Sequence, residues 1–99
     1  MREEYRKRRD LVVARLREMP GVECVPPAGS FYVFPRVDRH YRPDRQGSVA
    51  FAEYLLDEAR VAVVPGVAFG DDNHIRISFA CSRRTLEDGL ERMAQALSG

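Results

Sequence analysis

The heptapeptide HIRISFA, residues 74–80, alternates strictly between large apolar side chains and others, and it constrains the fold more than any other stretch. Successive side chains of a β-strand point to opposite faces, which places Ile75, Ile77 and Phe79 together on one face. Such a pattern predicts a strand with one buried face, and that face needs a layer of other elements to cover it. We therefore expect a sheet backed by helices.

Three segments have helical periodicity. In residues 2–19 the apolar side chains recur along one helical face, and a Pro-Gly pair ends the pattern. Ser48 is expected to be the N-cap of a second helix that runs to about Ala59, and Ser82 the N-cap of a third. The apolar stripe of the third helix comprises Leu86, Leu90, Met93, Ala94 and Leu97.

Besides HIRISFA, residues 22–24, 30–37 and 61–64 are predicted strands, because apolar, aromatic and β-branched side chains dominate them. Pro35 indicates an edge or a bulge in the second of these strands. The order is helix, two strands, helix, two strands, helix. It predicts an α+β two-layer sandwich, with a small, mostly antiparallel sheet of three to four strands and helices mainly on one face.

The residues between these elements carry turn and loop signals. PPAG at residues 26–29 predicts a rigid turn, and residues 38–47 combine polar side chains with Pro and Gly, which is typical of a surface loop. Residues 70–73 are expected to turn the chain between the last two strands.

The balance of charge argues against several classes of partner. The chain has 16 basic and 15 acidic residues and a formal charge of +1, so no bulk field attracts nucleic acid or an anionic membrane. The basic run at residues 6–9 is flanked by acidic residues and lacks interleaved aromatics, which favours a solvated helix face. No apolar stretch approaches the roughly 18 residues of a membrane span. We expect a cytoplasmic protein that binds neither nucleic acid nor membrane.

The cysteine and histidine patterns indicate no metal or thiol chemistry. Cys24 and Cys81 are far apart and show no CxxC spacing, so they are expected to be reduced and to pack as small apolar side chains. His74 has no second ligand at metal spacing, which favours a role in ordering the loop. No metal site and no catalytic residue set are expected in these 99 residues.

Arg76 lies on the face of HIRISFA opposite the isoleucines, beside a glycine-punctuated loop. A guanidinium on a rigid strand can bind a carboxylate through two parallel hydrogen bonds. An outward strand arginine is more commonly solvated or paired with an acid such as Asp71 or Asp72, and spacing alone favours that role. In GSFYVF, Phe31 or Tyr32 could line a pocket, although core packing predicts the same pattern.

Three long pieces of the sequence occur together: YRKRRDLVVARLREMPGVECVPPAGSFYVFPRV, VAVVPGVAFGDDNHIRISFA and SRRTLEDGLERM. Their order and spacing resemble those of class I and II pyridoxal-phosphate-dependent aminotransferases over nearly all 99 residues. The resemblance implies the C-terminal small domain of an aspartate aminotransferase-like enzyme of fold type I.

The resemblance also implies roles for individual residues. Arg76 would bind the α-carboxylate of an amino acid, the loop at residues 65–70 would shape the site entrance, and Phe31 would border the substrate side. Pyridoxal phosphate and its lysine would belong to a large domain that is absent from this chain. Lys7, the only lysine, lacks the family's context for that role.

Residues 1–99 are therefore expected to be a small domain or fragment that is inactive alone. The intact enzyme would be a homodimer that transfers an amino group from an amino acid to a 2-oxo acid. A free-standing α+β module that binds a carboxylate or a protein without catalysis is the alternative.

Overall fold

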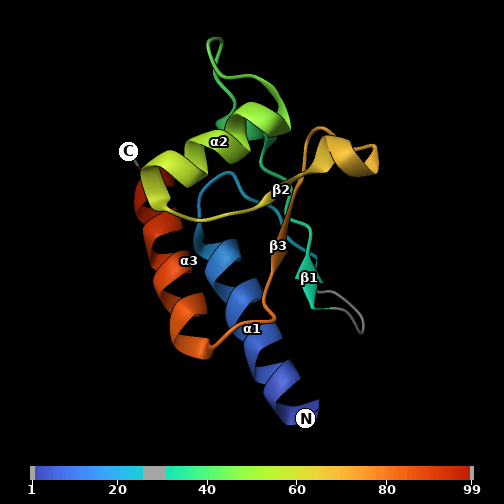
Figure 1. Ribbon diagram of the computed structural model, residues 1–99, viewed down its shortest axis with the longest axis vertical. Helices are drawn as coiled ribbons and strands as arrows, with labels where there is room; N and C mark the ends of the chain where they lie inside the picture. The colour runs from blue at the N-terminus through green and yellow to red at the C-terminus, as the bar shows by residue number, and fades with distance from the viewer. Residues whose placement is uncertain (1, 26–30, 99) are drawn as a thin grey trace.

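The HIRISFA strand lies at the centre of a three-stranded sheet in the computed structural model, which describes residues 2–25 and 31–98 (Figure 1). The elements in chain order are α1 (Arg2–Glu18), β1 (Tyr32–Val33), the 3-10 helix η1 (Asp38–His40), α2 (Gly47–Ala59), β2 (Val64–Pro65), the 3-10 helix η2 (Gly66–Phe69), β3 (Ile75–Ser78) and α3 (Arg83–Ser98). The predicted α+β class is confirmed.

The sheet has the order β1-β3-β2, and both strand pairs are antiparallel. Tyr32 pairs with Ser78, and Val64 pairs with Arg76, so Arg76 has a neighbouring strand on each side. A bridge between Arg36 and His74 continues the register of β1 after an interruption. Pro35 lies at that interruption because it has no N–H to donate, as expected for an edge strand.

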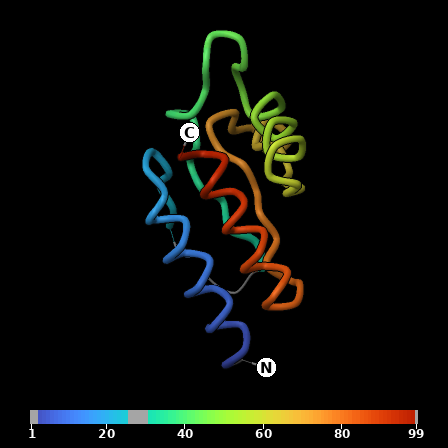
Figure 2. The backbone as a smooth tube through the Cα atoms, turned by 90° about the vertical axis from the view of Figure 1, so that its left-hand side faces the viewer, coloured from blue at the N-terminus to red at the C-terminus, as the bar shows by residue number. Residues whose placement is uncertain are grey.

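One face of the sheet is buried beneath helices. Val33, Ile75, Ile77 and Phe79 are at most 5% exposed, which confirms the predicted alternation along β3. Figure 2 shows α1 and α3 side by side, in front of the strands that they cover. The side chains that complete this core from the helices are Val12, Val13, Leu16, Met19, Phe51, Leu55, Ala59, Leu86, Leu90 and Met93.

The predicted strands are shorter than expected, including the one at 30–37, of which only Tyr32–Val33 form β1. Residues 22–24 contribute only a bridge between Glu23 and Arg36, and the run at 61–64 enters the ladder only at Val64. Val61 and Val63 still pack against the core. An apolar run indicates burial and not backbone pairing, so the run at 61–64 predicted a longer strand than the structure has. The predicted turn at 26–29 lies outside the described residues.

The predicted helix ends are partly confirmed. The Ser82 hydroxyl accepts a hydrogen bond from the Thr85 N–H at 3.1 Å, as an N-cap does. Arg60 takes the left-handed conformation, with φ of 55°, and ends α2. The prediction that Ser48 caps α2 was wrong, because Gln46 is the N-cap and the Ser48 hydroxyl donates to the Asp72 carboxylate and accepts from the Val67 backbone N–H. None of the described helices combines the length and apolar character that crossing a membrane requires.

Candidate functional site

Arg76 is half-buried on the face of β3 that the helices leave open. Its Cζ atom lies 4.2 Å from the ring centroid of Tyr32 and 4.4 Å from that of Phe69. Its Nε atom is buried without a hydrogen-bond partner. Within residues 2–25 and 31–98, Arg76 forms no ion pair, so the expected pairing with Asp71 or Asp72 does not occur.

Aromatic rings surround this guanidinium on the open face of the sheet. Tyr32, Phe34 and Phe69 are each between 37% and 48% exposed, which is unusual for large rings. Phe34 stacks on the His74 ring at 4.9 Å and meets the Phe69 ring edge to face at 6.1 Å. Arg76 therefore lies in an aromatic cluster that consists of Tyr32, Phe34, Phe69 and His74.

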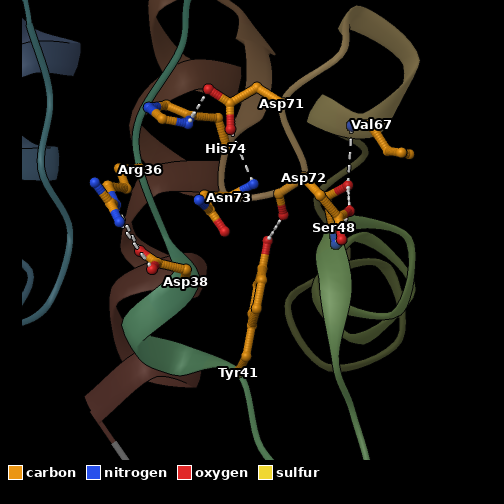
Figure 3. A network of polar contacts seen from close by, with 9 residues as sticks. All are labelled: Arg36, Asp38, Tyr41, Ser48, Val67, Asp71, Asp72, Asn73 and His74. Atoms are coloured by element: carbon orange, nitrogen blue, oxygen red, sulfur yellow. Dashed lines mark hydrogen bonds and ion pairs between the residues drawn. The ribbon is translucent and has the colours of Figure 1, made fainter.

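The loop that carries Phe69 is attached to the start of α2 (Figure 3). The Ser48 backbone N–H and hydroxyl both donate to the Asp72 carboxylate, at 2.9 and 2.7 Å. The same hydroxyl accepts a hydrogen bond from the Val67 N–H at 3.1 Å. The Tyr41 hydroxyl donates to the Asp72 carbonyl at 2.6 Å, and burial raises the pKa of Tyr41 to about 12. These bonds join Tyr41 and the start of α2 to η2 and to the turn after it.

A second acid, Asp71, holds the turn that follows η2. Asp71 accepts a hydrogen bond from the Asn73 N–H at 3.1 Å, and its other oxygen lies 3.0 Å from Nδ1 of His74 (Figure 3). The Asn73 hydrogen bond and then His74 lower the pKa of Asp71. His74 thus orders the loop, as expected. A Cβ at Gly66 would collide with the backbone carbonyls of Asp71 and His74, so the first loop position requires glycine.

Acid should destabilise the chain partly through Asp72. Hydrogen bonds from the backbone and side chain of Ser48 lower the pKa of Asp72 below its ordinary 3.8. A lowered folded pKa gives stability that is present above the unfolded pKa and is lost as the pH falls through the folded value. We expect the decline in urea midpoint from about pH 5 to pH 2 to be shallower in Asp72→Asn than in the unmodified chain.

Ser48→Ala is the matched control, because it removes one of the two donors to Asp72 and keeps the backbone one. Its pH dependence should fall between those of Asp72→Asn and the unmodified chain. Asp38 and Asp71, whose pKa values are also lowered, supply the slope that remains. Equal slopes in Asp72→Asn and the unmodified chain would contradict this role for Asp72.

Phe31 lies apart from Arg76. Its ring meets Tyr5 edge to face at 5.2 Å and lies 5.7 Å from the Phe79 ring, so it packs toward α1 and the core. The neighbouring Tyr32 contacts Arg76 instead, because adjacent strand residues point to opposite faces. The substrate-bordering role of Phe31 stays a prediction.

The remaining candidate residues lie outside the aromatic cluster. Cys24 is buried in the core, where desolvation raises the pKa of its thiol and disfavours the nucleophilic thiolate. Cys81 lines a cavity of about 190 Å³ beside α3, which Arg76 does not reach. Both thiols are free. In the described part of the chain, no group of three or more His, Cys, Asp or Glu residues could hold a metal ion.

The basic run on α1 has the local partners of a solvated helix face. Arg8 pairs with Glu4 at 3.1 Å, one turn earlier, and Arg9 pairs with Asp10 at 3.2 Å. Arg6 and Lys7 are exposed. Two of the four basic side chains in this run therefore have acidic partners on α1.

Nearly the whole chain matches one enzyme family. The family model described as aminotransferase class I and II matches residues 1–93. The chain belongs to this family. Class I and II aminotransferases depend on pyridoxal phosphate, and the resemblance drawn from the three sequence pieces is confirmed.

Several relatives of this aminotransferase chain are named for an activity. It is 43% identical to an aspartate aminotransferase of Pyrococcus horikoshii, covering the whole chain and 25% of the relative. It is 42% identical to a probable aspartate/prephenate aminotransferase of Aquifex aeolicus, covering 98% and 24%. The solved aspartate aminotransferase of Rhizobium meliloti superposes with a TM-score of 0.90 at 40% identity, covering 97% and 26%. The chain thus spans about a quarter of the length of these relatives.

Within residues 2–25 and 31–98, the one lysine of this aminotransferase chain does not lie in a setting that suits pyridoxal phosphate. Such enzymes hold the cofactor covalently through a lysine. Lys7 is the only lysine in the sequence, and it is exposed on α1 among other charged residues.

Proposed function

We propose that this chain forms the substrate-carboxylate side of an aminotransferase active site, with Arg76 binding the α-carboxylate of an amino acid. One observation carries the proposal: the Arg76 guanidinium lies on the central strand without an acid partner in the described residues. The two nearby acids, Asp71 and Asp72, are bound to other groups. A substrate carboxylate is the partner that this arrangement lacks.

The geometry supports carboxylate binding in two ways. The Arg76 Cζ lies over two aromatic rings, and no acid within residues 2–25 and 31–98 pairs with its guanidinium, whose Nη–H groups can form two parallel hydrogen bonds with a carboxylate. Its place in a strand with neighbours on both sides fixes the backbone from which the side chain extends. Binding here orients the amino acid, and closure of the domain over it excludes water.

In this proposal a large domain holds the cofactor, and the small domain closes against it within a homodimer. The substrates are an amino acid and a 2-oxo acid, and aspartate is the first amino acid to test because two relatives are named for it. The chain covers 25% of the Pyrococcus relative, which favours an enzyme part over a free-standing binding module.

The reading frame upstream of Met1 discriminates between these two functions. An enzyme part requires on the order of 300 further residues that include a cofactor-binding lysine, as one large domain would provide. A natural protein that starts at Met1 would support the binding module instead.

The 99-residue chain alone should neither bind pyridoxal phosphate specifically nor transfer amino groups. Titration of the purified chain with the cofactor should give the absorbance spectrum of free pyridoxal phosphate, without a band that shifts when an amino acid is added. Lys7→Arg is the control, since any band that it abolishes comes from surface reaction at Lys7. An amino-acid-sensitive band that survives in Lys7→Arg would overturn the prediction.

A further inference from the structure

We propose that Phe69 is a positioning residue for Arg76. Its ring, together with that of Tyr32, holds the guanidinium in the orientation that presents its Nη groups to the substrate. This inference rests on the proposed function of Arg76 and adds a residue whose only connection to the substrate runs through that arginine.

Arg76 needs such support because little else in the described residues restrains its side chain. Arginine has many rotamers, and substrate affinity falls when binding must restrict a side chain to one of them, because the lost conformational entropy costs free energy. The Arg76 Nε has no hydrogen-bond partner, and the side chain forms no ion pair within residues 2–25 and 31–98. The two ring contacts are thus the attractive interactions that orient the guanidinium.

Ring contacts are chemically suited to this role. A guanidinium within about 6 Å of an aromatic centroid is attracted by the negative face of the ring. Both distances, 4.2 Å to Tyr32 and 4.4 Å to Phe69, are well inside that limit. An acid at the same place would occupy the donors that the substrate needs, whereas a ring leaves them free.

The Phe69 ring is itself held in place. Phe69 ends η2, where the Val67 N–H donates to Ser48 and the Gly66 N–H donates to the His74 carbonyl at 2.8 Å. Phe34 contacts the ring edge to face. Tyr32 comes from β1, on the other side of β3 from β2 and the η2 turn that follows it, so both flanks of Arg76 contribute a ring.

Core packing does not explain Phe69. The side chain is 48% exposed, and it lies outside the cluster of buried apolar residues. Exposing about half of this ring to water is unfavourable, and the cation–π contact with Arg76 offsets that cost. Removing the ring should therefore affect substrate binding more than folding.

The test uses the full-length enzyme that contains this chain, with L-aspartate as substrate. Phe69→Leu should raise KM about 3- to 30-fold, the range expected for loss of one partly desolvated cation–π contact. The value of kcat should stay within about twofold, because carboxylate binding acts in the ground state and the transition state alike. Phe69→Tyr retains a ring and should restore KM to within about twofold of the unmodified enzyme.

A double-mutant cycle separates positioning from loop shape. In the Arg76→Ala enzyme, Phe69→Leu should cause no further loss of kcat/KM, since the residue that it orients is gone. An equal loss in both backgrounds would mean that Phe69 acts on the loop and would overturn the inference.

The same cycle distinguishes failure of this inference from failure of the proposed function. If Arg76→Ala leaves kcat/KM unchanged, the proposed function of Arg76 fails, and the positioning role fails with it. If Arg76→Ala impairs the enzyme and Phe69→Leu leaves KM unchanged, only the role of Phe69 is rejected.

Discussion

Arg76→Ala should lower kcat/KM for amino acids by about 10²- to 10³-fold in the full-length enzyme, because in the proposed role Arg76 is the charged partner that makes two hydrogen bonds with the substrate carboxylate. The loss should appear mainly as weaker substrate binding, measured by steady-state kinetics with L-aspartate. The absorbance of the bound cofactor should be unchanged, since in the proposed function a separate large domain holds the cofactor and Arg76 contacts aromatic rings.

Two further variants make this result specific. Arg76→Lys keeps the charge but loses the planar fork, so it should recover only part of the activity. Arg84→Ala removes an exposed arginine from the first turn of α3, in the helix layer that covers the buried face of the sheet, and should stay within about twofold of the unmodified enzyme. Unchanged catalytic efficiency in Arg76→Ala would contradict the proposed role and indicate that Arg76 is an ordinary solvated surface residue.

Leu55→Ala should destabilise the chain by about 2–5 kcal/mol, because Leu55 is fully buried in the core and its truncation leaves a cavity. A domain of this size has only about 5–15 kcal/mol of total stability, so the variant should unfold at much lower urea concentration. Urea unfolding followed by circular dichroism measures the shift.

Leu56→Ala is the matched control, since the same atoms are removed from the next residue of α2. Leu56 is 52% exposed, and its truncation should change the free energy of unfolding by no more than about 0.5 kcal/mol. Similar losses in the two variants would contradict the assignment of Leu55 to the core face of α2.

Local patterns in the sequence predicted most of the fold. The alternation of HIRISFA predicted the central strand and its buried face, and the Ser82 cap and the end of the second helix at about Ala59 are confirmed. Strand lengths were less predictable. The run at 61–64 is apolar because Val61 and Val63 pack on the core, and periodicity does not distinguish such packing from backbone pairing.

The sequence predicted Arg76 and the loop before it as candidate site residues, but not the residues that contact them in the structure. The sequence predicts Ser48 as a helix N-cap because Ser is common at that position. Its hydroxyl instead donates a hydrogen bond to Asp72, which is 24 positions away in the sequence. One sequence feature could have indicated Phe69 as a candidate: it is a large aromatic side chain between loop glycines, where burial is not expected.

By itself, the sequence determined the family, the elements and the face of the strand on which Arg76 lies, because these depend on side chains at fixed spacing along the chain. Only the tertiary structure decided what Arg76 touches. Tyr32, Phe69 and Arg76 belong to three separate elements, and the strand order β1-β3-β2 brings them together. Contacts of that kind are set by how the layers pack, and no local period in the chain records them.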